Sequence, residues 1–319
     1  MDVPISVYIM KCIVRMVICV KYSKLAVELL KGVEQIIYYD PVYHGRTLKI
    51  FGIDNDPTKM IKYLADKYLE KDYGIVIFDT TGDYPKEGFE SIIKIEDGKP
   101  TGLDPIKMAK EGIIDDPYTA VTIVQTIYEL DRSLTEKLYA DVLFGKIESV
   151  PQAASAEEKY GEVIRESYTS LDETFFQGST PNFGNSILVD LSDAHSITIV
   201  GMAFLIVAAV VRKRRHIFIG LDDAAVLAYT PAGSAAIPLL TQPMRGRATA
   251  LATRYAIESI LNISGPTLML YTDPDIQSLI YESNGVPPGA MRKRVLKGKG
   301  AFIWRTPETI NVEDGDLLV

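Results

Sequence analysis

The sequence predicts an α/β protein with a mostly parallel sheet flanked by helices and with an all-helical insertion. Short Ile- and Val-rich runs, typical of strands buried on both faces, alternate with segments whose apolar residues have helical spacing. This alternation is typical of parallel sheets. One long segment breaks it, because it is helical in pattern throughout and is punctuated by Pro117 and Pro151.

The expected order along the chain follows from these runs. Four segments are expected. They are an N-terminal segment (1–43), a first part of the α/β core (44–104), the helical insertion (105–180) and a second part of the core with a C-terminal tail (181–319). The core strands are expected at 47–52, 74–78, 186–191, 217–221, 267–271 and 301–304. The core helices are expected at 58–69, 197–211 and 247–261.

Composition excludes several classes of protein. The chain has 319 residues, 47% of them hydrophobic, and a net charge of -8. This acidic balance argues against a uniformly basic nucleic-acid-binding protein but leaves room for a local basic surface. The two cysteines, Cys12 and Cys19, have no metal-ligand spacing, so we expect neither a zinc site nor a disulfide framework.

Two apolar runs bear on membrane insertion. Residues 3–20 are interrupted by Lys11 and Arg15, and residues 197–211 are shorter than the roughly 20 residues that a spanning helix needs. We therefore expect a buried core helix at 197–211 and a cytoplasmic protein. Membrane association through residues 3–20 stays open as an alternative.

The loop after the first core strand lies where a phosphate-binding P-loop would lie. A working P-loop reads G-x-x-x-x-G-K-[ST], and the loop begins correctly at Gly52. Pro57 replaces the second glycine, Thr58 replaces the lysine, and Lys59 stands where Ser or Thr would hold magnesium. Proline also removes one of the N–H donors that cradle phosphate.

Acidic residues in this loop oppose phosphate as well. Asp54 and Asp56 would each repel a phosphate by roughly 3 kcal/mol at about 5 Å and an effective dielectric of about 20. An alternative explains the loop without nucleotide, because Asp54, Asn55 and Asp56 are all good helix N-caps. On either interpretation we expect little or no nucleotide binding.

Several motifs in fixed order resemble the HerA/FtsK superfamily of DNA-pumping ATPases. Gly74–Tyr84 resembles its strand and turn after the P-loop helix, 187–192 its next strand, 216–225 its Walker B strand and 270–274 its sensor strand. Arg245-Gly246-Arg247 resembles a basic turn of the family, and His44 precedes the first strand as in HerA. The resemblance covers 44–304 and implies a RecA-like core.

The resemblance also implies roles for individual residues. Asp222 would orient magnesium, Asp223 would polarise the attacking water, and Thr272 would lie at the sensor position. The family has glutamate where Asp223 stands and glutamine where Asp273 stands. The shorter Asp223 side chain would misplace its carboxylate by roughly 1 Å, which can cost about 100-fold in rate. Asp222 and Asp223 could instead simply cap the next element.

Basic residues supply further candidates. By analogy with the family, Arg245, Arg247 and Arg254 could reach the active site of a neighbouring subunit, although Arg247 and Arg254 also suit an exposed helix face. DNA contacts are expected from the two dense basic stretches, which could equally be solvated surface: Arg212, Lys213, Arg214, Arg292, Lys293 and Arg294.

The resemblance and its departures together favour one function. We expect an inactive or very weak P-loop ATPase that serves as a non-catalytic subunit or scaffold of a DNA-processing or DNA-translocating assembly. Its partners would be DNA, an active ATPase relative or a nuclease, in a homo- or hetero-oligomer. We expect no cofactor. One alternative is a slow DNA-dependent ATPase that binds Mg-ATP through Lys59 and Asp222. Another is an interaction module that binds no nucleotide.

Overall fold

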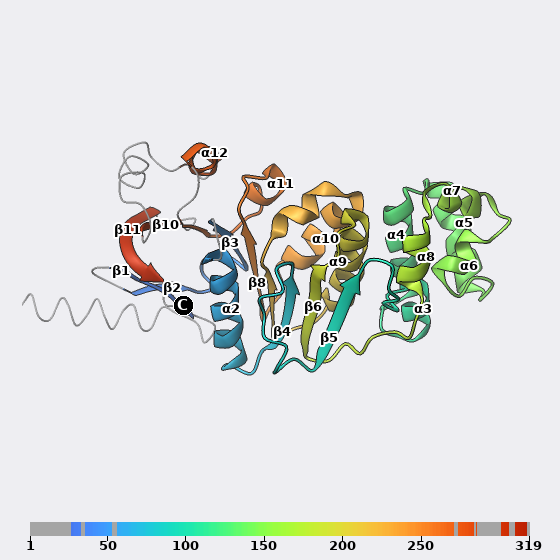
Figure 1. Ribbon diagram of the computed structural model, residues 1–319, viewed down its shortest axis with the longest axis horizontal. Coiled ribbons are helices and arrows are strands. Elements are labelled where there is room, and N and C mark those ends of the chain that lie inside the picture. The colour runs from blue at the N-terminus through green and yellow to red at the C-terminus, as the bar shows by residue number, and fades with distance from the viewer. Residues whose placement is uncertain are drawn as a thin grey trace, which may run out of the picture.

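The computed structural model describes residues 27–32, 36–52, 56–270, 274–283, 285, 301–305 and 310–317. In this part of the chain, eleven strands form one sheet in the order β2-β1-β11-β10-β9-β3-β8-β7-β4-β6-β5 (Figure 1). The strands are β1 Val27–Gly32, β2 Ile36–Tyr39, β3 Thr47–Phe51, β4 Gly74–Asp79, β5 Ser91–Glu96, β6 Ser186–Asp193, β7 Ile217–Leu221, β8 Arg247–Thr253, β9 Thr267–Met269, β10 Ala301–Arg305 and β11 Ile310–Leu317.

The helices fall into a core set and an insertion. The core helices are α2 Asp56–Leu69, α9 Ile197–Val211, η1 Ala224–Tyr229, α10 Pro231–Thr241, α11 Glu258–Leu261 and α12 Pro274–Ser283. The insertion between β5 and β6 holds α3 Pro105–Lys110, α4 Pro117–Tyr128, α5 Arg132–Leu143, α6 Val150–Ala154, α7 Lys159–Ser167 and α8 Ser170–Phe176.

Seven strands, from β9 to β5 in the sheet order, are all parallel to one another. Helices cover both faces of this part of the sheet, so the predicted α/β class and mostly parallel sheet are confirmed. Beyond β9, the strands β10, β11, β1 and β2 pair antiparallel. The N-terminal pair therefore joins the C-terminal pair in one sheet, an arrangement that the sequence analysis did not predict.

Alternate residues of each central strand enter two separate cores. In β4, Val76 and Phe78 face the core that contains α9 and α10, whereas Ile75 and Ile77 face the core that contains α2. Both faces are apolar because both are covered by helices, as parallel sheets require. Helix α9 is buried along nearly its whole length, as predicted for residues 197–211. Within the described residues, no helix combines the length and apolar character needed to cross a membrane.

The insertion packs beyond the β5 side of the sheet, at the far right of Figure 1. Asp104 caps α3 by accepting hydrogen bonds from Ile106 N and Lys107 N. Its other oxygen accepts from Val150 N at the start of α6, 2.8 Å away. One buried carboxylate therefore satisfies N–H groups at the starts of two helices and joins them within the insertion. The helical pattern expected for this segment is present.

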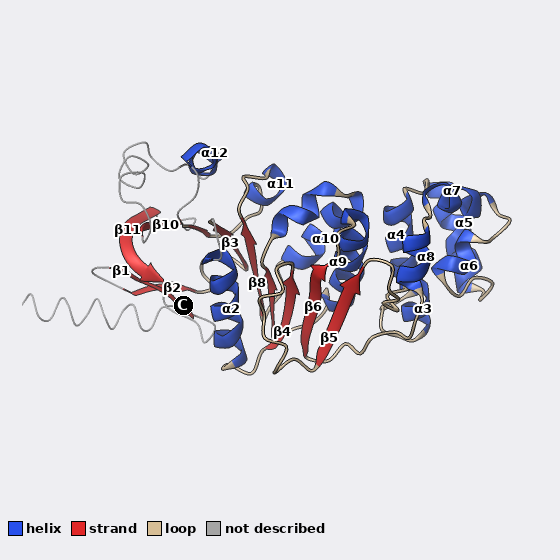
Figure 2. Cartoon of the chain, in the orientation of Figure 1, coloured by secondary structure: helices blue, strands red, loops and turns tan. Residues whose placement is uncertain are grey.

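The prediction of a helix at 247–261 was wrong. Residues Arg247–Thr253 form the central strand β8, and only the short α11 follows. Ala248, Ala250 and Ala252 of this strand lie in the core beneath α2. Alanine favours helix locally, but pairing with β7 and β3 on both sides decides the outcome. The helix that crosses from β7 to β8 is α10, which contains Pro238 (Figure 2).

Candidate functional site

The carboxyl ends of the parallel strands bring several acidic residues to one edge of the sheet, here called the carboxyl edge. Asp79 ends β4, Asp190 lies near the end of β6, and Asp222 directly follows β7. All three side chains are buried. In open α/β sheets this edge is where ligands bind. It is therefore the place to test for nucleotide chemistry.

Asp79 and Asp222 form a closed pair. Asp222 accepts hydrogen bonds from Thr80 N, 3.0 Å from Oδ1, and from the Thr80 hydroxyl at 2.8 Å. The Thr81 hydroxyl lies between the two carboxyl groups, 3.1 Å from Asp79 Oδ1 and 3.2 Å from Asp222 Oδ2. Asp79 also accepts from the backbone N–H groups of Thr81, Gly82 and, more weakly, Tyr84. The turn after β4 therefore encloses both carboxyl groups.

This enclosure alters the protonation of Asp222. Burial raises the pKa of Asp222 to about 7, hydrogen bonds from Thr80 oppose the shift, and the neighbouring Asp79 adds to it. Two carboxylates at such close range rarely ionise together, because their charges repel in a poorly solvated site. Near neutral pH the pair therefore holds a proton for part of the time.

Asp223 serves as a helix cap. Its Oδ1 accepts from Ala225 N at 3.0 Å and so begins η1. Burial raises the pKa of Asp223, while this hydrogen bond and the positive charge of Arg254 pull it down. Arg254 itself is exposed and follows β8 at the carboxyl edge. The capping alternative considered for Asp223 thus describes its contacts in this structure.

Asp190 lies on β6, the neighbour of β4 on the side away from β7, and it has partners of its own. Its Oδ1 accepts from the Ser192 hydroxyl at 2.6 Å, and its Oδ2 pairs with Lys86 Nζ at 3.0 Å. Burial alone would raise the pKa of Asp190, but these contacts outweigh burial and hold it below its ordinary value. Asp190 is therefore ionised and paired at neutral pH.

The loop that corresponds to a P-loop is described at its two ends. A Cβ at Gly52 would lie 3.0 Å from the Pro57 ring and 3.1 Å from Leu270, so glycine is needed there for packing. Thr58, at the lysine position, is buried, and its carbonyl accepts from the Tyr84 hydroxyl at 3.3 Å. Lys59 is exposed and lines a small pocket of about 170 Å³ with Lys62, Asp83 and others.

Three features of the described residues bear on whether a Mg-nucleotide could bind here. A magnesium-orienting carboxylate must be ionised and open to metal-bound water, whereas both oxygens of Asp222 are engaged inside the protein. The position of the phosphate-binding lysine is held by the buried Thr58. Among the described residues, no group of three or more His, Cys, Asp or Glu could hold a metal ion.

Some predicted site residues lie outside the described residues and stay predictions. They are Asp54, Thr272, Arg292, Lys293 and Arg294, together with the side chain of Asp56.

Of the three arginines expected to act on a neighbouring subunit, Arg245 and Arg247 lie at the amino edge of the sheet, where the parallel strands begin, and Arg254 lies at the carboxyl edge. Arg247 starts β8 and is fully buried. Its guanidinium donates to Val211 O at 2.6 Å and Leu239 O at 3.1 Å, in the last turns of α9 and α10. A side chain so enclosed has no surface from which to reach another subunit. Arg245 is exposed in the turn before it.

The basic run after α9 divides into residues with different partners. Arg212 and Lys213 pair with Asp115 of the insertion at 3.0 and 2.9 Å. Arg214 donates to the backbone carbonyls of Phe183 and Gly184. Three of the basic residues expected to contact DNA therefore already have partners within the chain, and Arg215 is the exposed residue that follows them.

Sequence reasoning missed the most enclosed members of the site. Asp79, Thr80 and Asp190 lie inside motifs that were singled out, but none was named as a site residue. A signal was present, since Asp79 and Asp190 each stand at or near the carboxyl end of a buried apolar strand. The pairing between Asp79 and Asp222 had no local signal, because the two residues lie far apart in the chain. Thr80, which directly follows Asp79, is 142 positions from Asp222.

Comparisons with known proteins place the fold. No family model matches this chain, and no curated protein matches it. Among solved structures, VirB4 of Thermoanaerobacter pseudethanolicus matches 91% of this chain and 96% of its own, with a TM-score of 0.67 and 12% identity.

Two further solved structures match with TM-scores below 0.5. The bacterial conjugative coupling protein TrwBdeltaN70 has a TM-score of 0.48 at 12% identity, covering 93% of this chain and 90% of its own. The genome packaging NTPase B204 from Sulfolobus turreted icosahedral virus 2, in complex with ATP-gammaS, has a TM-score of 0.42 at 11% identity, covering 84% and 95%. The VirB4 comparison carries the argument: this chain has the same fold as VirB4 over nearly its whole length.

Proposed function

We propose that this chain is a non-catalytic subunit or scaffold of a DNA-processing or DNA-translocating assembly, built on an ATPase fold whose nucleotide site no longer works. The fold supports the assembly class. The closed pair of Asp79 and Asp222 carries the inference that the site is inactive. Asp222 is 5% exposed, and both of its oxygens accept hydrogen bonds from the turn after β4.

The first turn of α2 supports the same conclusion. Thr58 occupies the lysine position and is buried, and Pro57 stands in place of the second glycine. Without that lysine the β- and γ-phosphates would lose their main protein charge. In such an assembly the chain would place its surfaces beside those of an active ATPase relative or a nuclease, and DNA would be the shared substrate.

Mg-ATP binding tests the proposal directly. Isothermal titration calorimetry on the full chain, with a thermal-shift assay in parallel, should show no heat of binding and no stabilisation at millimolar Mg-ATP. A ligand at 100 times its Kd would stabilise the chain by about 2.7 kcal/mol, so binding would be easily seen.

Micromolar binding would overturn the proposal. The alternative is a slow ATPase that uses Lys59 and Asp222, because Lys59 is exposed in the first turn of α2. In that case Lys59→Ala should abolish the binding. Lys62→Ala, one turn along the same helix and lining the same small pocket, is the matched control and should leave it unchanged.

A further inference from the structure

We propose that the amino edge of the sheet, opposite the acidic carboxyl edge, binds the phosphate backbone of duplex DNA; this deepens the proposed function and rests on it. A groove of about 520 Å³, here called the amino-edge groove, lies where β4, β6 and β7 begin. It is lined chiefly by Asp72, Tyr73, Glu90, Asn185, Arg214, Arg215 and His216.

Exposed basic side chains border this groove. Arg215 and His216 are both exposed, and the structure gives Arg215 no ion pair with any described residue. Arg245 is exposed in the next turn along this edge. That turn lies against the groove, because a Cβ at Gly246 would be 3.2 Å from His216 N. Arg215 and Arg245 can therefore contact two phosphates at neighbouring positions.

The neighbouring basic residues are already committed. Asp115 pairs with both Arg212 and Lys213, Asp116 lies 3.8 Å from Arg212, and backbone carbonyls hold Arg214. An exposed arginine without a partner loses less on binding phosphate than a lysine that must first leave a carboxylate. Within one basic run, the structure thus separates Arg215 from Lys213, which sequence alone treats as equivalent.

Other residues of the groove suit a nucleic-acid backbone. The half-buried Tyr73 ring lies edge-on against His216 with centroids 5.6 Å apart, and Asn185 is exposed as a donor. The Glu90 carboxylate accepts from Asn185 N at 2.8 Å and holds the loop that forms one wall. Asp72 and Glu90 are both exposed acids in this groove, and their charges should oppose phosphate.

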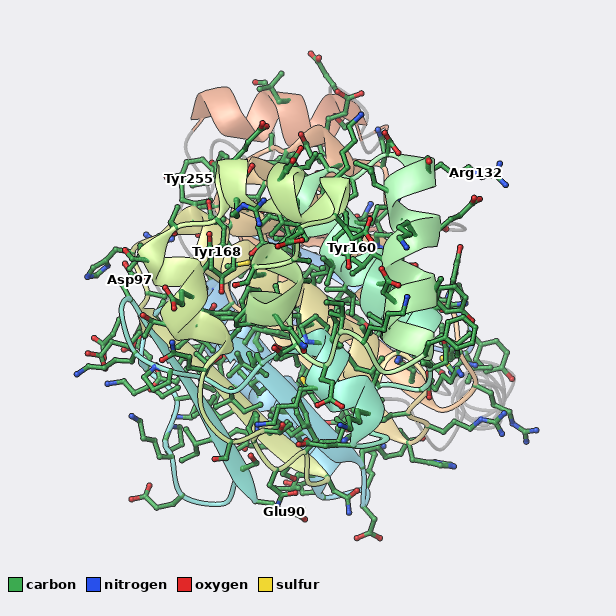
Figure 3. All side chains as sticks on the ribbon, turned by 90° about the vertical axis from the view of Figure 1, so that its right-hand side faces the viewer. Glu90, Asp97, Arg132, Tyr160, Tyr168 and Tyr255 are labelled. Atoms are coloured by element: carbon green, nitrogen blue, oxygen red, sulfur yellow. The ribbon has the colours of Figure 1, made fainter. Side chains whose placement is uncertain are left out.

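The opposite edge is the more acidic at its centre. Asp83 is exposed at the carboxyl edge above the buried Asp79, Asp190 and Asp222, while the exposed Asp193 is paired with Lys94 at 2.7 Å. Figure 3 shows the two edges well separated, with Glu90 before β5 at the bottom and Tyr255 after β8 near the top. In a chain of net charge -8, Arg215 and Arg245 are exposed arginines at the amino edge that can attract phosphate.

The test measures fluorescence anisotropy of a short labelled DNA duplex with the full-length chain at about 50 and 200 mM salt. Arg215→Ala combined with Arg245→Ala should weaken binding at least roughly tenfold and reduce the salt slope by about 1 per lost contact. Lys213→Ala, the matched control, should change binding less than about twofold. Asp72→Asn should strengthen binding, because it removes a negative charge from the groove. The fold should be kept, because asparagine tolerates the left-handed backbone at φ 60°.

Several outcomes would overturn the inference. They are no binding by the wild-type chain, equal losses for Lys213→Ala and Arg215→Ala, or loss only when Arg292, Lys293 and Arg294 are replaced. Stronger displacement by inorganic phosphate than by chloride at equal ionic strength would indicate a small-anion site instead. Thermal unfolding of each variant shows that it is folded. Because Mg-ATP binding is measured separately, a failure of the proposed function and a failure of this inference can be told apart.

Discussion

At the scale of single residues, the least expected feature is a carboxyl pair at the position where an ATPase would hold magnesium. Asp79 and Asp222 are 1% and 5% exposed. Two threonines, Thr80 and Thr81, supply the hydrogen bonds that make this burial tolerable. The pair is stable when one proton is shared, because a single charge then remains in the site.

The raised pKa of Asp222 gives stability a definite pH dependence. In the unfolded chain Asp222 titrates near its ordinary value of 3.8, and in the folded chain near 7. The folded state therefore binds the proton more tightly. The contribution of this group to stability is full below about pH 4 and is lost as pH rises through 7.

Asp222→Asn should therefore raise the melting temperature at pH 8 and change it little at pH 4. The amide resembles the protonated acid and can donate to Asp79. Thermal unfolding followed by circular dichroism at both pH values measures this. Asp83→Asn, an exposed change in the same turn, is the control and should have no pH-dependent effect. A lower melting temperature for Asp222→Asn at pH 8 would contradict the account.

At the scale of elements, one arginine joins two helices to the sheet. Arg247 begins β8, and its guanidinium reaches the carbonyls at the ends of α9 and α10. Helix C-termini carry partial negative charge, so they suit this cation, which has no ion pair with a carboxylate among the described residues. Burial lowers the pKa of Arg247 to about 10, which still leaves the side chain charged at neutral pH.

Arg247→Ala should lower the free energy of unfolding by about 3 kcal/mol, because it removes two hydrogen bonds from a charged donor and leaves a cavity. Arg247→Lys should lose less, since it keeps the charge but reaches one helix end. Urea unfolding measures both variants. Arg245→Ala, exposed two residues earlier, should stay within about 0.5 kcal/mol. An unchanged stability for Arg247→Ala would show that the contacts contribute little.

At the scale of the whole molecule, two cores share one sheet. The core beneath α9 and α10 extends into the insertion, while the core beneath α2 is smaller. The central strands β8, β7 and β4 are paired on both sides and covered on both faces. Strand β5 is paired with β6 on one side and is the last strand in the sheet order.

Hydrogen exchange should follow this arrangement. Amides of β7 should exchange slowest, through global unfolding, and those of β5 on the order of 100-fold faster or more, through local opening. Mass spectrometry of the native chain measures both segments, Ile217–Leu221 and Ser91–Glu96. Equal protection of the two would mean that the insertion stabilises the β5 side as strongly as the sheet centre.

The sequence by itself determined the fold class and most of the parallel core. The strand expected at 217–221 and the helix expected at 197–211 have the bounds of β7 and α9, because an uninterrupted apolar run must be buried wherever it lies. The sequence also singled out Asp222, which directly follows β7. These features are local, so the pattern of nearby residues was enough to predict them.

Only the tertiary structure decided the rest. It made Arg247–Thr253 a strand, although its alanines favour helix, because two neighbouring strands pair with it. It brought Asp79 beside Asp222, enclosed Arg247, and divided the basic run by placing Asp115 near Lys213. Each of these results depends on contacts between residues far apart in the chain. Local propensity contributes tenths of a kcal/mol per residue, whereas burial and pairing contribute roughly one or more.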